Sequence, residues 1–287
     1  MCASVCSRYK KYSCAQTFRD IMLRSVCLLL FATVAGVFCT AGRTARHGPS
    51  VSVVNGRIIN GVDAAPGEFP AQLSMQTDGR HFCGASILNE NWAITAAHCF
   101  DNGGSVEVLA GTTKLDSGGT RHSVEFVEVH PKYNSSDSWV NDVAVMRVSP
   151  PFQIDNVTVA RIQLPAEGEE TPAGTNVTVI GWGRLSYGGA RPNDLQKVDV
   201  QVWDQQLCAT LFWDGFENTV YPTMLCAAGV EEQASSCSGD SGGPLLRDGV
   251  MVGIVSWSFQ CATPPYPTVY TRVSSYLDWI RENAGSW

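Results

Sequence analysis

Short apolar runs separated by turn-forming residues recur along this chain from residue 71 to residue 273. Each run spans four to six residues, and most are bounded by Gly, Pro, Asn, Asp or Ser. Such runs predict β-strands, and their regular recurrence is typical of antiparallel barrels or sandwiches. The strands that we expect are Ala71–Gln76, Ala85–Leu88, Val106–Leu109, Val124–Val129, Val143–Val148, Val177–Ile180, Val198–Val202, Val250–Val255 and Thr268–Val273.

A helical pattern stands out at the C-terminal end of the chain. The pair Ser274-Ser275 predicts a helix cap, because serine hydroxyls accept hydrogen bonds from the first helical N–H groups. The expected apolar face contains Tyr276, Leu277, Trp279 and Ile280.

Composition and charge narrow the class of protein. The chain has 287 residues, of which 44% are hydrophobic and 16% charged, as in globular proteins. Residues 1–57 carry eight Lys or Arg and one acidic residue, so the other 230 residues hold a net charge of −14. We therefore expect no nucleic-acid partner, because an acidic body repels polyanions.

The N-terminal region resembles a secretory leader. Met22 and Arg24 precede an apolar run of about 14 residues, which is short for a membrane span, and the small residues 40–42 follow it. We predict a signal peptide over residues 22–42, after a basic leader of uncertain status over residues 1–21. The alternative is a signal anchor with a cytoplasmic tail, and it depends on whether translation begins at Met1 or at Met22.

Residues 43–57 form a short polar segment that contains Gly and Pro and has no helical periodicity. This composition indicates a linker or a propeptide. It ends in Asn55-Gly56-Arg57, and Ile58 follows directly.

Cysteines indicate an oxidising compartment. Five of the eleven lie in the leader and six lie in the body, and an even number in a secreted body predicts disulfides. Sequence alone does not choose among the pairings of six cysteines. No paired C-x-x-C spacing occurs, so a zinc site is not expected.

Three motifs carry candidate chemistry. Gly239-Asp240-Ser241-Gly242-Gly243-Pro244 surrounds one serine with small residues, which leaves its hydroxyl accessible beside backbone N–H groups. Upstream lie Thr95-Ala96-Ala97-His98-Cys99 and Asn141-Asp142-Val143-Ala144-Val145. A serine nucleophile needs a base for its proton and a carboxylate that orients the base. His98, Asp142 and Ser241 supply these three groups.

These motifs, in the order His, Asp, Ser, resemble those of the chymotrypsin/trypsin-like serine protease family. The resemblance covers about four-fifths of the chain, from Ile58 to the C-terminus. It implies an all-β fold of two antiparallel six-stranded β-barrels with a C-terminal α-helix. The barrels would span about residues 58–164 and 165–287, and the active site would lie in the cleft between them.

The resemblance also implies roles for individual residues. Ser241 would attack the peptide carbonyl, His98 would take its proton, and Asp142 would orient His98. The N–H groups of Gly239 and Ser241 would form the oxyanion hole. Cleavage between Arg57 and Ile58 would free an ammonium that pairs with Asp240. The implied disulfides are Cys83–Cys99, Cys208–Cys226 and Cys237–Cys261.

The residues that would contact the substrate argue against cleavage after Lys or Arg. By similarity Ser235 forms the base of the pocket for the side chain before the scissile bond, where trypsin-like members place an aspartate. Ser258 and Thr268 stand at wall positions that are glycine in large flat pockets. We therefore predict cleavage after apolar side chains such as Leu or Met, with Ala, Val, Phe and Tyr as alternatives. The strand Ser256-Trp257-Ser258 would pair with the substrate backbone.

Further expectations concern partners and modification. We expect a secreted monomer that acts on proteins or peptides, is activated by a trypsin-like protease and has protein protease inhibitors as candidate partners. Asn134, Asn156 and Asn176 begin sequons for N-glycosylation. No cofactor or metal is expected, and Thr112 falls where calcium-binding members often have glutamate. The alternative functions are a membrane-anchored processing protease and a non-catalytic binding protein on the same fold.

One stretch between Cys208 and Cys226 is a few residues longer than in digestive members of the family. Its aromatic residues Phe212, Trp213 and Phe216 predict either core packing, which we favour, or an apolar rim for extended substrates.

Overall fold

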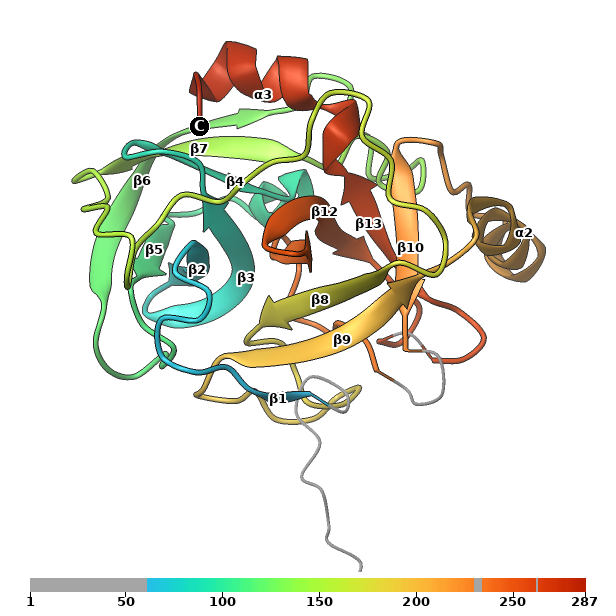
Figure 1. Cartoon of the computed structure of the whole chain (residues 1–287), viewed down its shortest axis with the longest axis horizontal. Coiled ribbons are helices and arrows are strands. Elements are labelled where there is room, and N and C mark those ends of the chain that lie inside the picture. Colours follow the sequence, from blue (N-terminus) through green and yellow to red (C-terminus); the bar gives the residue numbers. More distant parts are fainter. Residues whose placement is uncertain (1–60, 230–233, 262) are drawn as a thin grey trace, which may run out of the picture. The chain divides into compact units, whose positions relative to one another are not determined.

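The structure is a computed structural model that describes residues 61–229, 234–261 and 263–287. The expected leader, signal peptide and propeptide, together with Arg57 and Ile58, lie outside the described residues. Most described residues belong to strands and to the loops between them (Figure 1).

The first barrel is closed by six antiparallel strands in the order β2-β3-β4-β7-β6-β5. Its core is a continuous cluster of aliphatic side chains in which Leu73, Met75, Ile87 and Met146 are fully buried. The strands are β2 (Gln72–Thr77), β3 (Arg80–Ile87), β4 (Trp92–Thr95), β5 (Glu107–Ala110), β6 (Thr120–Val129) and β7 (Ala144–Ser149).

The second barrel has the order β9-β10-β13-β12-β11-β8, and the pairing of β8 with β9 closes it. A short strand, β1 (Val62–Asp63), adds to the edge of β9. The barrel strands are β8 (Asn176–Gly181), β9 (Gln196–Val202), β10 (Met224–Ala228), β11 (Pro244–Arg247), β12 (Val250–Trp257) and β13 (Thr268–Arg272). The predicted fold of two six-stranded barrels is therefore confirmed.

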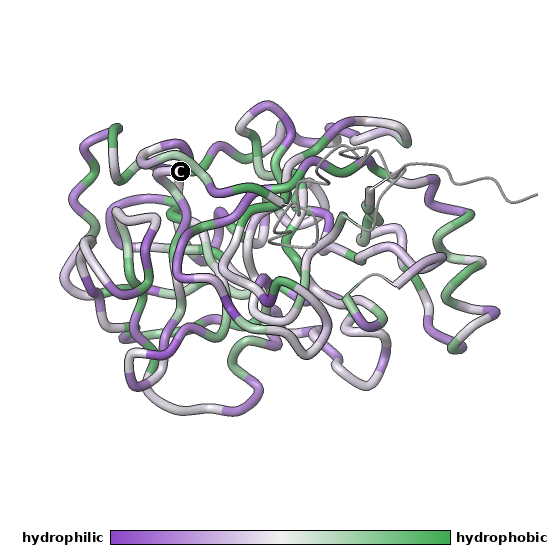
Figure 2. Tube along the Cα trace, turned by 90° about the horizontal axis from the view of Figure 1, so that it is seen from below, coloured by the Kyte–Doolittle hydropathy of each residue, from purple (hydrophilic) through white to green (hydrophobic). Residues whose placement is uncertain are grey.

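Strand β9 of the second barrel shows a regular alternation of buried and less buried side chains. In β9, Val198, Val200 and Val202 are buried, while Asp199 between them is exposed. Side chains alternate between the two faces of a strand, so this pattern places the valines in the barrel interior. Figure 2 shows hydrophobic and hydrophilic positions interspersed along the trace.

Strands β1, β4, β10 and β11 were not predicted, and neither was helix α2 (Gln205–Phe216). Strand β10 reads Met-Leu-Cys-Ala-Ala and is buried at every position, so it shows no alternation. Strand β11 begins at Pro244, a residue that ordinarily argues against a strand interior. Short, uniformly buried or proline-containing strands give little periodic signal.

The C-terminal helix α3 (Leu277–Ala284) is present, but its predicted serine cap is wrong. Ser274 and Ser275 lie in a 3₁₀ turn, η2 (Val273–Ser275), and Tyr276 occupies the cap position without a side-chain hydrogen bond. Leu277 and Ile280 are buried, as the predicted apolar face requires. Among the described residues, no helix combines the length and apolar character that crossing a membrane demands.

Candidate active site

Three hydrogen bonds between distant segments bring the candidate residues together. The Gly84 N–H of β3 donates to the Ser241 carbonyl at 2.7 Å. This bond joins the first barrel to the loop 239–243, which carries Ser241 and is called the serine loop below. The Thr271 hydroxyl of β13 donates to the Asp142 carbonyl, also at 2.7 Å. The Tyr276 hydroxyl donates to Asn141 at 3.0 Å. Both barrels thus fix the positions of the loops that carry Asp142 and Ser241.

His98 is oriented by Asp142 through two contacts. The His98 backbone N–H donates to one carboxylate oxygen at 2.9 Å, and ring Nδ1 lies 2.7 Å from the other. His98 sits in the turn η1 (Ala97–Phe100), and the Cys83–Cys99 disulfide ties this turn to β3. Because Nδ1 donates to the carboxylate, Nε2 of the neutral ring is left as the acceptor.

Asp142 is itself buried and fully bonded. The Ser256 hydroxyl donates to its carboxylate at 2.5 Å, and only 1% of Asp142 is exposed. Burial disfavours the His98 imidazolium, but the neighbouring Asp142 carboxylate outweighs this effect and raises the pKa of His98 above its ordinary value of 6.5. The pair is arranged to take up a proton and to stabilise the resulting imidazolium.

Ser241 and His98 line the same cavity, although no direct hydrogen bond joins their side chains in the described part of the chain. The serine lies in a tight turn that depends on its glycine neighbour. A Cβ atom on Gly242, whose φ is +78°, would lie 2.1 Å from the Thr95 hydroxyl oxygen. Any side chain at position 242 would therefore displace the serine loop.

Successive N–H groups around Ser241 divide into two sets. Those of Asp240 and Gly242 donate inward, to the Cys237 and Val255 carbonyls at 2.9 and 2.8 Å. Those of Gly239 and Ser241 have no acceptor among the residues that the structure describes. Gly239 has a φ of +108°, a backbone conformation that residues other than glycine rarely adopt. These two N–H groups beside the Ser241 hydroxyl are therefore available to an oxygen atom from outside the protein, as the predicted oxyanion hole requires.

Asp240 points away from the cavity into the protein. Its oxygens accept the N–H groups of Gly183 and Cys237, each at 2.8 Å, and it is fully buried. Burial raises the pKa of Asp240 to about 6, against the two hydrogen bonds and the positive charge of Arg191. A buried carboxylate in this state is suited to an additional positively charged partner.

The cavity beside Ser241 has a volume of about 300 Å³ and no acidic lining residue in the described chain. Ser236 and Thr268 lie on its wall, and their hydroxyls are 3.0 Å apart. Ser235, the residue expected at the base of the pocket, is 1% exposed and its hydroxyl donates to the Cys261 carbonyl at 2.9 Å. Its role at the base of the pocket stays a prediction.

The remaining residues expected to contact the substrate surround this cavity. Ser256, Trp257 and Ser258 of β12 and the adjoining loop line it, as does Trp139. The Trp257 ring packs against Phe212, with ring centroids 4.7 Å apart, so Trp257 also contributes to the core. Trp139 and Tyr187 were missed in the sequence because both come from irregular loops without a motif.

All six body cysteines form the disulfides that the resemblance implies: Cys83–Cys99, Cys208–Cys226 and Cys237–Cys261. In the described chain, the one cluster of potential metal-ligating atoms consists of Cys83, His98 and Cys99. Two of its members are joined in a disulfide, so they offer no thiolates to a metal.

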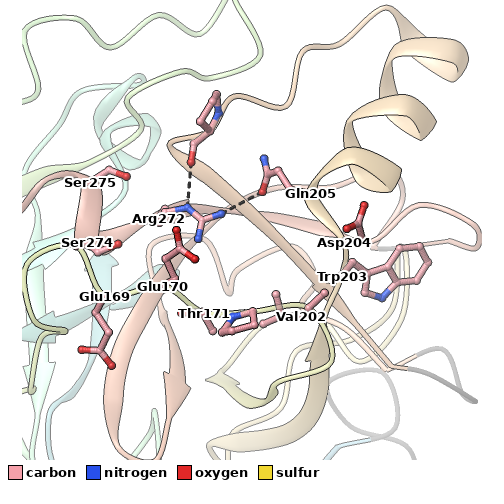
Figure 3. A pocket seen from close by; sticks show the side chains of 14 residues that line it. Glu169, Glu170, Thr171, Val202, Trp203, Asp204, Gln205, Arg272, Ser274 and Ser275 are labelled. Atoms are coloured by element: carbon pink, nitrogen blue, oxygen red, sulfur yellow. Dashed lines mark hydrogen bonds between the residues drawn. The ribbon is translucent and has the colours of Figure 1, made fainter.

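A second cavity, of about 520 Å³, lies elsewhere, around Arg272 of β13 (Figure 3). The Arg272 guanidinium donates to Gln205 and to the Pro222 and Met224 carbonyls at 2.9–3.0 Å. These bonds tie β13 to β10 and to the start of α2. None of His98, Asp142 and Ser241 lines this cavity, so it takes no part in the chemistry of these three residues.

The fold and site define a serine protease, and the comparisons give its family. The family model described as Trypsin matches residues 58–280, so the chain belongs to the trypsin family and is a serine endopeptidase. It is 36% identical to "Trypsin delta" of Drosophila melanogaster over 92% of this chain and all of that protein. It is 40% identical to "Trypsin-1" of Astacus astacus over 79% of this chain and all of that protein.

A third relative, "Trypsin" of Phaedon cochleariae, is 34% identical over 88% of this chain and 96% of its own length. These relatives are trypsins and do not support the apolar specificity expected from the sequence.

Proposed function

We propose that this endopeptidase is secreted as an inactive precursor and cleaves after apolar side chains such as Leu or Met. Its catalytic triad is Ser241, His98 and Asp142. The observation that carries the proposed specificity is the cavity beside Ser241, which has no acidic residue on its described lining.

In the proposed reaction, Ser241 Oγ attacks the peptide carbonyl while His98 Nε2 takes the hydroxyl proton. The developing oxyanion is bound by the N–H groups of Gly239 and Ser241. His98 then gives the proton to the leaving amine, and water repeats the sequence on the acyl-enzyme. The contacts of His98 with Asp142 support this assignment, because they hold Nε2 free for the transfer.

The cavity disfavours a lysine or arginine side chain. A buried cation needs an anionic partner, and the lining offers hydroxyl groups instead. Ser236 and Thr268 already bond to each other, so they present little unsatisfied polarity to an apolar side chain. The side chains of Ser258 and Thr268 also occupy volume, which favours Leu or Met over larger rings.

Activation and secretion are proposed on separate grounds. The buried Asp240 carboxylate is suited to the ammonium that cleavage after Arg57 would create at Ile58. The three disulfides fit an oxidising compartment. Asn134, Asn156 and Asn176 are all exposed, as N-glycosylation requires. Activation by a trypsin-like protease, a monomeric state and regulation by protein inhibitors complete the proposal.

A panel of peptides that differ only in the residue before the scissile bond tests the specificity. We expect kcat/KM for Leu or Met to exceed that for Arg or Lys by at least about a hundredfold, because a cation would enter the cavity unpaired. Ser241→Ala provides the control for contaminating proteases and should leave no hydrolysis and no labelling by a phosphonylating reagent. Preferred cleavage after Arg or Lys by the Ser241-dependent activity would overturn the specificity and leave the triad intact.

A further inference from the structure

Two arginines flank one loop at the edge of the active site, and Tyr187 of this loop lines the cavity beside Ser241. Arg184 and Arg191 stand at the two ends of the loop 185–190, which the Leu185 N–H closes onto the Ala190 carbonyl at 3.1 Å. Partial burial and then the charge of Arg184 lower the pKa of Arg191, while the Asp240 carboxylate raises it. The Arg184 backbone N–H donates to the Ser238 carbonyl at 2.9 Å, which places this end of the loop beside the serine segment.

Arg191 lies directly against the oxyanion hole. A Cβ atom placed on Gly239 would lie 3.4 Å from Arg191 Nε and 3.6 Å from Nη2. Arg191 Nη1 donates to the His81 carbonyl, and His81 Nε2 lies 2.9 Å from the Gly239 carbonyl. These contacts fix the guanidinium beside the backbone that would bind the scissile carbonyl.

Neither arginine has an acidic partner at hydrogen-bonding distance in the described chain. Arg191 is exposed, and one of its five N–H donors bonds to the His81 carbonyl. Arg184 donates to the Gly189 carbonyl. Other arginines of the same acidic protein do form ion pairs: Arg121, Arg147, Arg161, Arg247 and Arg281. The Asp240 carboxylate influences Arg191 electrostatically, but no hydrogen bond joins the two groups in the described chain. The exposed guanidinium of Arg191 therefore keeps N–H donors that an external anion can use.

The position of this pair relative to Ser241 indicates which part of a substrate meets it. The cavity for the side chain before the scissile bond is lined by Ser256, Trp257 and Ser258, and neither His81 nor Arg191 contributes to it. With the scissile carbonyl at Ser241, the chain after the bond must leave past the opposite wall. That wall includes β3, which contacts the serine loop through Gly84, and Arg191.

We propose that Arg191, assisted by Arg184, selects substrates with a glutamate or aspartate at the first or second position after the scissile bond. Four donors of Arg191 remain to bind a carboxylate, and a planar guanidinium matches such a group in two parallel hydrogen bonds. The proposal rests on the endopeptidase activity and is independent of which residue precedes the bond.

Internally quenched peptides that differ only by Glu or Gln at each of these two positions test the proposal on the processed enzyme. The residue before the bond is whichever one the enzyme cleaves best, so a failure of the apolar preference would not affect the comparison. We expect kcat/KM for Glu to exceed that for Gln about threefold to tenfold at one position or both. The ratio should fall as salt is added, because ions screen exposed charges.

Variants at position 191 test whether Arg191 causes the preference for Glu over Gln. Arg191→Gln should bring the Glu/Gln ratio of kcat/KM close to one, and Arg191→Lys should retain part of the preference. Arg191→Glu should lower the ratio below one, because the new carboxylate repels a Glu peptide. Arg281→Gln, which removes an exposed arginine of α3, is the matched control and should keep the wild-type ratio. A wild-type ratio near one at both positions would overturn the proposal, and so would a ratio that persists in Arg191→Gln. Because each result is a ratio, a general loss of activity in a variant does not imitate the expected outcome.

Discussion

Asp142 controls both the orientation of His98 and its affinity for a proton. Its two oxygens contact the His98 backbone N–H and Nδ1 at 2.9 and 2.7 Å. The same carboxylate stabilises the imidazolium and so keeps the pKa of His98 above 6.5 despite burial. His98 accepts the serine proton only when neutral. Activity should therefore rise with pH through a midpoint above 6.5 and be lost below it.

Asp142→Asn tests this assignment. The variant removes the charge that raises the pKa of His98 and leaves burial, which lowers it, so the acid limb of kcat/KM should move to lower pH. Turnover should fall by about 10⁴, because an asparagine no longer selects the productive tautomer. The measurement is a pH profile of kcat/KM on one peptide.

Asp101→Asn is the matched control for this profile. Asp101 also raises the pKa of His98, but its contribution is the smallest of those that act on the ring and includes no hydrogen bond to it. Its loss should cause a smaller shift in the same direction with little change in turnover. An acid limb that stays in place in Asp142→Asn would contradict the role given to Asp142.

Among the elements, α2 shows how one helix serves two environments. Asp204 caps it by accepting the Leu207 N–H at 2.8 Å, and Glu217 ends it in a left-handed conformation. Phe212 is 1% exposed and packs against Trp257, whereas Trp213 is 58% exposed and Phe216 is 39% exposed. The favoured core assignment is thus correct for Phe212 and wrong for Trp213. In Figure 2 this helix, the zigzag at the right, carries hydrophobic and hydrophilic positions together.

Adjacent aromatic residues of α2 therefore give a matched pair of variants. Phe212→Ala should reduce the free energy of unfolding by about 3–5 kcal/mol, because it leaves a cavity behind Trp257. Trp213→Ala should change it by less than about 1 kcal/mol, since most of the indole is already in water. Denaturant unfolding of both variants with the disulfides intact provides the values. Equal losses in the two variants would show that the helix buries both rings to the same extent.

The strands predicted from the sequence are apolar runs between turn-forming residues, whereas the missed strands are two to five residues long and β11 begins with proline. Strands such as β9 alternate between buried and exposed residues, so their range was nearly recovered from the pattern. In α2 the capping signal was a single aspartate, Asp204, and the aromatic residues gave no way to tell the buried face from the exposed one. In the site, motifs located His98, Asp142 and Ser241. Arg191 gave no signal, because its closeness to Gly239 arises only when distant segments meet.

At the scale of the whole molecule, the residue before Ser241 is a buried aspartate whose ionised form is disfavoured by burial. Asp240 is buried and has a pKa raised to about 6, so the folded state retains its proton more readily than an exposed aspartate does. The stability that this protonation provides is present at low pH and is lost as pH rises through about 6. At neutral pH an additional positive charge would be needed to stabilise the ionised form. The proposed ammonium of Ile58 is such a charge, and it exists only after cleavage at Arg57.

Arg57→Gln should therefore give a folded precursor that a trypsin-like protease does not convert. Leaving a buried charge unpaired costs about 3 kcal/mol or more, which corresponds to a difference of about a hundredfold in activity between processed wild type and the variant. Asp240→Asn separates processing from pairing: it should be cleaved after Arg57 like the wild type, as intact mass shows, yet gain little activity. The processed wild type should also lose activity at alkaline pH as the ammonium deprotonates, since pairing raises its pKa above the ordinary value near 8 but does not abolish titration. Full activity in uncleaved Arg57→Gln would mean that the Asp240 loop reaches its active arrangement without a new N-terminus, and that Arg191 or hydrogen bonds alone hold the carboxylate.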